Sequence, residues 1–442
     1  MLSFDVRHLL GDKFVLAVFL LALTGLSAVA QKTGPAQTSK PVAWPDPLVL
    51  ESGAPVLTRE RFEQQRRGEL LSLFAENVYG KTPQATVPIA IVAAKVDEHA
   101  LDGLAVRKQI TLAVGSKGER TWHLLLYTPA HATGPVSVIV GLNFNGNQTV
   151  DPDPEIELNP VWVRDPALAS TPLAKELSGH VLKIAESGTR GAAAQQWQLH
   201  LLLARGYGLA TLYAGDIEPD FIGGIGYGVR PLLFGPKQSV PAADDWGAIG
   251  AWAWGMSRVV DVLSSDPHID AKRLIAFGFS RFGKTALWAA AQDQRFALVL
   301  SNESGQGGAT LSHRQEGEPI DHMMLAFPYW FCGNYQHYLG RTQSLPVDGH
   351  LLLSLIAPRP LYVGSAGSDP YSDPEGEFLA VKAVAPVYAL YGEQGVTDTA
   401  MPPLNHPVGQ WVSYHVRPGG HDVTLYDWEQ YLNFADRVLG NK

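Results

Sequence analysis

A serine in a glycine-flanked turn is the first residue of this chain whose surroundings suggest chemistry. Ser280 lies in the stretch 278–283 (GFSRFG), between an apolar run that predicts a strand and an Ala-rich run that predicts a helix. A serine in such a turn is exposed at the end of a sheet, where the free N–H groups of the following helix can stabilise an oxyanion. We therefore predict that Ser280 is a nucleophile.

The spacing of this stretch leaves a second interpretation open. It reads G-x-S-x-x-G, one residue longer than the common nucleophile turn G-x-S-x-G. An ordinary serine in a strand-to-helix turn could have the same neighbours. The strand and the helix predicted on its two sides favour the nucleophile.

A general base for this serine should follow the last strand of the sheet. His421 lies there, in the glycine-flanked stretch 417–422 (RPGGHD), before the last predicted helix. Of its rivals, His406 has no strand directly before it and His415 lies within the strand itself. We predict that His421 takes the proton of Ser280, with an ordinary loop histidine as the alternative.

Two acids compete to orient this histidine. Asp369 follows the predicted strand 361–364, which is the usual place for the third residue of a catalytic triad, and Glu303 follows the strand before it, 296–300. Asp373 is a weaker candidate. Each acid could instead cap a helix or pair with an arginine, so the choice stays open.

These residues need a scaffold that brings the ends of distant strands together. From about residue 85, predicted strands alternate with predicted helices. The strands are 89–94, 123–127, 136–142, 208–213, 273–277, 296–300, 361–364 and 411–416, and the helices are 192–204, 246–263, 281–291 and 426–439. This alternation predicts an α/β fold, a three-layer sandwich with a mostly parallel central sheet and helices on both faces. The Pro- and Gly-rich stretches 151–182 and 216–245 should be loops that shape a cleft.

The first thirty residues have the pattern of a signal peptide. Basic residues precede an apolar run over 14–30, which ends in Ala28-Val29-Ala30. We expect a secreted or periplasmic bacterial protein with no membrane attachment after cleavage; an uncleaved anchor is the alternative. Residues 31–46 should be a flexible lead, and 47–442 a single catalytic domain.

The composition excludes several classes of function. The formal net charge of −9 disfavours nucleic-acid binding, which relies on basic surfaces. The sequence contains neither H-E-x-x-H nor a His/Cys cluster, so we expect no metal and no cofactor. We expect a monomer.

Five stretches resemble the glucuronoyl esterases of carbohydrate esterase family 15, and the resemblance covers about residues 120–440. They are 278–284 (GFSRFGK), 302–309 (NESGQGGA), 327–332 (FPYWFC), 355–360 (LIAPRP) and 419–422 (GGHD). The resemblance implies the α/β-hydrolase fold. It also implies hydrolysis of esters between (4-O-methyl-)glucuronic acid on glucuronoxylan and lignin alcohols, as in the bacterial branch of the family.

The resemblance also implies roles for individual residues. Arg281 would stabilise the oxyanion, Lys284 and Glu318 would bind the sugar, and Glu303 and Asp369 match the two alternative acids of the family.

This chain departs from the family pattern at two positions. Phe279 stands where many members have cysteine or histidine, and Tyr371 stands near a sugar-contacting tryptophan. Tyr371 can still stack or hydrogen-bond to sugar.

Some alternatives remain. Asn143 and Asn147 follow the predicted strand 136–142 and could supply a further oxyanion donor, or could be ordinary turn residues. The same catalytic set could serve an acetyl-xylan esterase or a general carbohydrate esterase. A catalytically inactive hydrolase fold that only binds carbohydrate or protein is a third interpretation.

Overall fold

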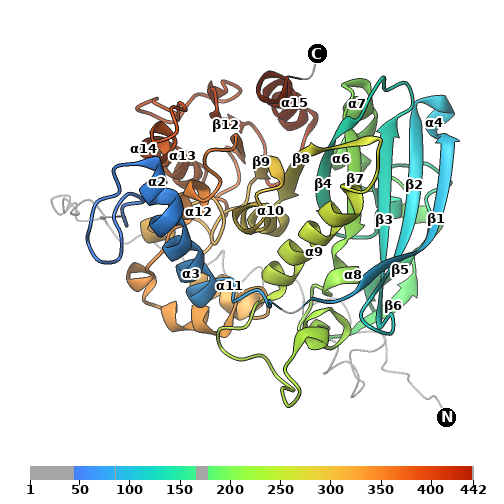
Figure 1. The fold of residues 1–442 in the computed structure, drawn as a ribbon, viewed down its shortest axis with the longest axis horizontal. Helices are drawn as coiled ribbons and strands as arrows, with labels where there is room; N and C mark the ends of the chain where they lie inside the picture. The colour runs from blue at the N-terminus through green and yellow to red at the C-terminus, as the bar shows by residue number, and fades with distance from the viewer. Residues whose placement is uncertain (1–43, 85, 166–177, 441–442) are drawn as a thin grey trace, which may run out of the picture. The chain divides into compact units, whose positions relative to one another are not determined.

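Ten strands form the central sheet of the computed structural model, which describes residues 44–84, 86–165 and 178–440 (Figure 1). The strands are β1 (Ile89–His99), β2 (Ala105–Val114), β3 (Arg120–Pro129), β4 (Val136–Asn143), β7 (Gly208–Tyr213), β8 (Ile269–Phe279), β9 (Phe296–Asn302), β10 (Leu361–Ala366), β11 (Val408–Gly409) and β12 (Val412–Arg417). Their order is β1-β2-β3-β7-β4-β8-β9-β10-β12-β11. The predicted signal peptide and all of the flexible lead before residue 44 lie outside the described residues.

Pairing is parallel through the centre of the sheet and antiparallel at its two ends. It is parallel from β7 through β4, β8, β9 and β10 to β12. The strands β1, β2, β3 and β7 pair antiparallel, as do β12 and β11. The predicted, mostly parallel sheet is therefore confirmed, with an antiparallel extension that Figure 1 shows at one edge.

Helices cover both faces of the sheet and bury two separate cores. On one face lie α3 (Arg67–Asn77), α9 (Ala248–Leu263), α10 (Arg281–Gln292), α12 (Gly349–Ser354) and α13 (Pro374–Ala383). On the other lie α6 (Ala194–Trp197), α7 (Leu199–Ala204) and α15 (Leu425–Leu439). Successive strand residues alternate between the two cores, as Ala276 and Phe277 do. This is the predicted three-layer sandwich.

Shorter elements complete the described chain. The helices are α2 (Arg59–Arg61), a π-helix (Phe62–Arg66), α4 (Ala100–Gly103), α8 (Ala214–Ile217), α11 (Ile320–Ala326) and α14 (Ala385–Ala389). Short 3₁₀ helices span Asn147–Thr149, Ser187–Thr189, Gly224–Tyr227, Arg230–Leu233, Ser312–Arg314, Gly333–Tyr338 and Thr342–Ser344. In the described part of the chain, no helix has both the length and the apolar character needed to cross a membrane.

Three local expectations need correction. The predicted helix 192–204 is two short helices, because Gln198 between them has a left-handed backbone with φ 47°. The stretch 151–182 contains part of a hairpin, β5 (Pro160–Arg164) with β6 (His180–Ile184), rather than loop alone. The predictions omitted β2, where consecutive polar residues interrupt the apolar alternation.

The parallel register places the predicted site residues at one edge of the sheet. Ser280 follows β8, Glu303 follows β9, Asp369 follows β10 and His421 follows β12. Because β8, β9, β10 and β12 are successive parallel neighbours, their carboxyl ends lie together.

Candidate active site

The backbone of Ser280 has the strained geometry of a nucleophile turn. Its φ of 58° and ψ of −127° lie in a region that non-glycine residues rarely adopt. The Ser280 amide donates to the carbonyl of Asn302 at 2.9 Å, and helix α10 begins at the next residue. The first N–H groups of α10 have no acceptor within the helix, so they can donate to a negatively charged oxygen beside the serine.

Two glycines make this turn possible and explain its spacing. A Cβ on Gly278 would lie 1.8 Å from the carbonyl oxygen of Phe282. A Cβ on Gly283 would lie 2.8 Å from the Cβ of Ser304. Both contacts are too close for any side chain, so the G-x-S-x-x-G pattern reflects a turn packed against its own helix and against the loop after β9.

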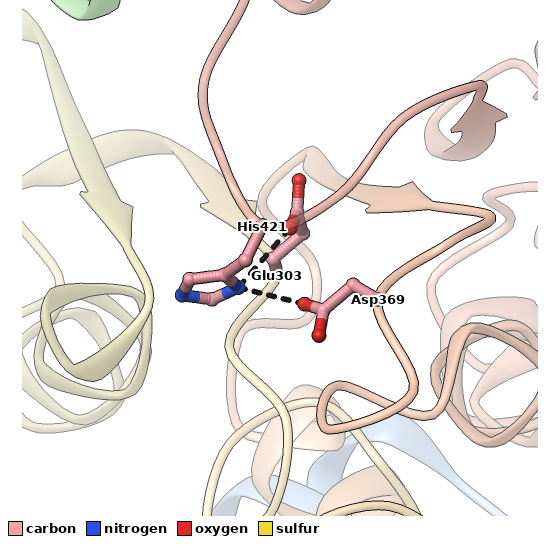
Figure 2. Close-up of side chains that lie close together, drawn as sticks. All are labelled: Glu303, Asp369 and His421. Carbon is pink, nitrogen blue, oxygen red and sulfur yellow. Dashed lines mark hydrogen bonds and ion pairs between the residues drawn. The ribbon is translucent and has the colours of Figure 1, made fainter. Parts of the chain in front are cut away.

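The imidazole of His421 lies between two carboxylates (Figure 2). Its Nδ1 is 2.7 Å from Oδ2 of Asp369 and 3.1 Å from Oε2 of Glu303. The other ring nitrogen, Nε2, points away from both acids. This nitrogen is therefore left to act as a base.

His421 also packs beside the nucleophile turn. The ring of Phe279, the residue before Ser280, lies 4.6 Å from the imidazole between centroids. Among the described residues, the His421 side chain makes its hydrogen bond through Nδ1 to Asp369, and none joins it to the Ser280 hydroxyl. Such contacts often tighten only when substrate binds.

Asp369 has the surroundings of an ionised carboxylate. It is buried, and it accepts hydrogen bonds from the hydroxyl of Ser372 and from the amide of Tyr371 at 3.1 Å. Burial alone would raise the pKa of Asp369, but the hydrogen bonds from His421 and Ser372 outweigh it and hold that pKa well below its usual range. Asp369 therefore carries a negative charge directly beside the imidazole.

Glu303 is also buried but has the opposite tendency. Burial raises the pKa of Glu303 above its usual value, although the hydrogen bond with His421 and the charge of Arg417 oppose the rise. Its backbone is left-handed, with φ 46°. Together the two acids, by their hydrogen bonds and charges, raise the pKa of His421 above its usual value despite its burial.

Arg417 links Glu303 to the loop that carries His421. Its Nη2 donates to Oε1 of Glu303 at 2.6 Å and to the carbonyl of Asp422 at 2.5 Å, and its Nη1 donates to the carbonyl of Gly420 at 3.2 Å. One guanidinium thus holds the residues on both sides of His421 and one of its acids.

The same three side chains could in principle hold a metal ion. One ligand atom from each of Glu303, Asp369 and His421 lies within 4.8 Å of the others, in the described part of the chain. The guanidinium of Arg417 is already bound to Glu303, and its charge opposes a second cation there. The donor set fits an oriented histidine better than a metal site.

The rival residues have other partners. His415 is fully buried in β12, and its Nε2 lies 2.8 Å from Oδ1 of Asp427. His406 contacts the carbonyl of Leu404 at the surface. Asp373 caps helix α13 by accepting from the amide of Gly376 at 3.0 Å. None of the three contacts His421.

The guanidinium of Arg281 lies within a group of aromatic side chains. It lies over the rings of Trp330 and Phe144, at 4.7 and 5.4 Å from their centroids, and forms an ion pair with Asp220. The family-like stretch 327–332 and the predicted cleft loop 216–245 therefore meet at this arginine.

The predicted sugar-binding residues lie near one another at the same edge of the sheet. Lys284 is buried, and its Nζ donates to the carbonyl of Ser304 at 2.5 Å. Burial lowers the pKa of Lys284 to about 8, and the negative charge of Glu318 is the strongest opposing influence. The amide of Glu318 donates to the carbonyl of Tyr371 at 2.9 Å, and the Tyr371 side chain is 60% exposed.

The two asparagines after β4 act within their own loop. The side-chain amide of Asn143 donates to Oδ1 of Asn147 at 2.7 Å, and that of Asn147 donates to the carbonyl of His123 at 2.7 Å. These contacts support the interpretation of both asparagines as turn residues. The loop instead contributes Phe144 beside Arg281.

Glu377, a buried acid that contacts the loop after β9 and the end of β10, was not identified from the sequence. Glu377 on α13 accepts from the hydroxyl of Ser365 at 2.5 Å and from the amide of Gly305 at 3.0 Å. It thereby fixes the ends of β10 and of the loop after β9. No local pattern marked Glu377, because its partners are distant in sequence.

Comparison with known proteins identifies the family. A family model described as glucuronyl esterase of fungi matches residues 240–392. The carbohydrate esterase MZ0003, from an unknown prokaryotic organism, is 41% identical over 396 residues, which cover 89% of each chain. The solved glucuronoyl esterase from Solibacter usitatus is 44% identical with a TM-score of 0.83, covering 89% of this chain and 97% of that one.

A third relative is a solved promiscuous CE15 esterase from a marine bacterial metagenome. It is 40% identical with a TM-score of 0.81, covering 91% of this chain and 98% of that one. The chain belongs to carbohydrate esterase family 15. In this family 15 esterase, Ser280, Glu303 and Asp369 lie inside the region that the family model matches, and His421 lies beyond it.

Proposed function

We propose that this protein is a serine carboxylesterase that cleaves esters of (4-O-methyl-)glucuronic acid on glucuronoxylan with lignin alcohols. The observation that carries the proposal is the pairing of a left-handed Ser280 turn with a His421 whose Nδ1 is held by Asp369 at 2.7 Å. The solved relative from Solibacter usitatus, 44% identical, is a glucuronoyl esterase.

The first half of the reaction transfers the uronoyl group to the enzyme. Ser280 attacks the ester carbonyl while Nε2 of His421 takes the hydroxyl proton. Arg281 and the first N–H groups of α10 stabilise the oxyanion of the tetrahedral intermediate. His421 then gives its proton to the departing alcohol oxygen, and a uronoyl ester on Ser280 remains.

The second half repeats these steps with water. His421 deprotonates a water molecule that attacks the acyl-enzyme, the tetrahedral intermediate collapses, and Ser280 regains its proton as the uronate leaves. Asp369 keeps the Nδ1 proton of His421 in place and stabilises the imidazolium. Glu303 supports the same nitrogen from the second side.

Recognition of the sugar is assigned to three residues near the nucleophile. Lys284 and Glu318 offer a cation and an anion to the ring hydroxyls, and Tyr371 offers an exposed aromatic face. A uronate ester carries its carbonyl directly on the sugar ring, so these groups need to lie within one sugar length of Ser280.

A comparison of two substrates tests the proposal. We expect the purified protein to hydrolyse benzyl glucuronate with a kcat/KM at least about tenfold above that for an acetylated sugar, a preference of about 1.4 kcal/mol. The Ser280→Ala variant is the control and should lose about 10³-fold or more. Stronger activity on acetylated xylan would instead favour a general carbohydrate esterase. This alternative is retained because one solved relative, 40% identical, is a promiscuous esterase.

We also propose that the protein is exported from the cytoplasm. Residues 1–30 would act as a signal peptide, and a single catalytic domain over 47–442 would be released as a secreted or periplasmic monomer. N-terminal sequencing of the exported protein should begin at Gln31. A full-length protein retained in the membrane fraction would contradict cleavage.

A further inference from the structure

Asp220 makes three contacts that join Arg281 to the family-like aromatic stretch. Its Oδ2 forms an ion pair with Nη1 of Arg281. Its Oδ1 accepts from the hydroxyl of Tyr329 and from Nε1 of Trp330, both at 2.8 Å. These two donors lie next to each other in the chain, so they fix the carboxylate plane and, through it, the guanidinium.

Aromatic rings restrict the same guanidinium on its faces. Trp330 lies 4.7 Å and Phe327 lies 5.7 Å from it, and these two rings stack at 3.9 Å with an interplanar angle of 3°. Cation–π contacts of this kind hold an arginine without using its N–H groups. Phe327 and Trp330, in the family-like stretch 327–332, therefore help to hold the Arg281 side chain in place.

These contacts leave the Nε edge of Arg281 without a protein acceptor. Asp220 occupies Nη1, whereas Nε is buried and has no hydrogen-bond partner among the described residues. The Nε and Nη2 donors form one edge of a planar guanidinium. A buried donor without a partner is costly unless a ligand satisfies it, so this edge is suited to an oxyanion.

The charge of Asp220 matters for a different step. An ester substrate is neutral at its carbonyl, but hydrolysis leaves a carboxylate in the same place. Arg281, together with Lys284 one helical turn away, would attract that anion and slow its release. Asp220 offsets the charge of Arg281 through its ion pair, and the negative charge of Glu318 acts on Lys284.

We propose that Asp220 is a positioning residue with two effects: it directs the free edge of Arg281 to the oxyanion, and it offsets the arginine charge so that the uronate product leaves. This inference rests on the proposed uronate esterase function. It extends that function from the chemical step to product release.

The test is the near-isosteric substitution Asp220→Asn, assayed with benzyl glucuronate. We expect kcat to fall about 10- to 100-fold, as for loss of an oriented oxyanion donor, with a smaller change in KM. Inhibition by D-glucuronate should strengthen at least about tenfold, while inhibition by the neutral D-glucuronamide changes less than about twofold. A glucuronate inhibition constant equal to that of the parent would overturn the proposal, as would equal changes for both inhibitors.

Two further variants separate charge from geometry. Tyr329→Phe removes one hydrogen bond to Asp220 but keeps its charge, so kcat should fall a few-fold and glucuronate inhibition should stay unchanged. Asp220→Glu also keeps the charge and remains informative if Asp220→Asn folds poorly. Stronger glucuronate inhibition in either charge-preserving variant would contradict the charge argument.

The outcome is distinguishable from failure of the proposed function. If the parent enzyme does not hydrolyse benzyl glucuronate, the uronate esterase proposal is wrong and this inference falls with it. If the parent hydrolyses the ester but Asp220→Asn has parent-like kcat and glucuronate inhibition, only the role of Asp220 is wrong.

Discussion

Nη2 of Arg417 lies 2.6 Å from Oε1 of Glu303, and both side chains are almost completely buried. This ion pair gives Glu303 a partner of its own. Asp369 has no arginine partner among the described residues, and its Oδ2 is the carboxylate oxygen nearest to His421. The two acids beside the histidine are therefore not equivalent.

This difference predicts unequal costs of removing the two acids. We expect Asp369→Asn to lower kcat/KM about 10³-fold and Glu303→Gln about tenfold. The reason is that Asp369 is the ionised carboxylate that accepts the Nδ1 proton of His421. Both variants should be measured with benzyl glucuronate after their folding is checked by circular dichroism. A larger loss in Glu303→Gln would identify Glu303 as the principal acid.

The pH dependence of Asp369→Asn follows from the same contact. His421 takes a proton only when it is neutral, and the acids raise its pKa, so activity should increase as the pH rises through that pKa. Removing the Asp369 charge lowers the pKa of His421. The acidic limb of kcat/KM should therefore move to lower pH in the variant, even though its maximum falls. A shift to higher pH would contradict this assignment.

Arg417 should matter for stability as well as activity. Arg417→Met leaves the buried carboxylates of Glu303 and Asp427 without their guanidinium, which should lower the free energy of unfolding by about 3–5 kcal/mol. Arg59→Met is a matched control, because its ion pair with Glu60 is solvent-exposed and should change the unfolding free energy very little. Equal denaturation midpoints for the two variants would show that the buried network adds no stability.

The nucleophile turn should not tolerate a methyl group. Gly278→Ala places a Cβ against the Phe282 carbonyl, so we expect a loss of about 3 kcal/mol in unfolding free energy and almost no esterase activity. Gly68→Ala is the control, since no atom lies within 4 Å of its added Cβ and it sits in helix α3. That variant should gain about 0.5–1 kcal/mol. Parent-like activity in Gly278→Ala would rule out the turn geometry.

Lys284 should give the enzyme a substrate-dependent response to alkaline pH. Its pKa is lowered to about 8, so it loses its positive charge as the pH rises through that value. We expect the KM for benzyl glucuronate to increase over this range, whereas the KM for p-nitrophenyl acetate, which has no sugar, stays flat. In Lys284→Met the KM for the uronate ester should be high at every pH. If the KM of Lys284→Met for the uronate ester still depends on pH in this range, a group other than Lys284 is responsible for the pH dependence.

The sequence alone predicted those features that are encoded locally. Continuous apolar runs marked β4 and β7, and the glycines around Ser280 and His421 marked the turns that expose them. Such patterns need only a few neighbouring residues. They placed the sandwich and most of its central strands correctly.

Long-range partners could not be predicted in this way. Asp220 and Arg281 are 61 residues apart, and Arg417 and Glu303 are 114 apart, so no spacing rule connects them. The choice between Glu303 and Asp369 also depends on which other side chains contact each carboxylate, and the sequence does not show these contacts. Strand β2 was missed because Arg107 and Lys108 interrupt the alternation of apolar and polar residues. Arg107 is nevertheless buried, because it forms an ion pair with the buried carboxylate of Asp153.

Helix α15 has a consequence for the biogenesis of the enzyme. Asp427 accepts from the Thr424 amide at 2.7 Å to cap this helix, and it also binds Arg417 at 2.7 Å. The cap is thereby joined to the loop that holds His421. A growing polypeptide that has not yet added residues 425–439 therefore already contains Ser280 and His421 but lacks Asp427, one of the two carboxylates that hold Arg417 beside the His421 loop.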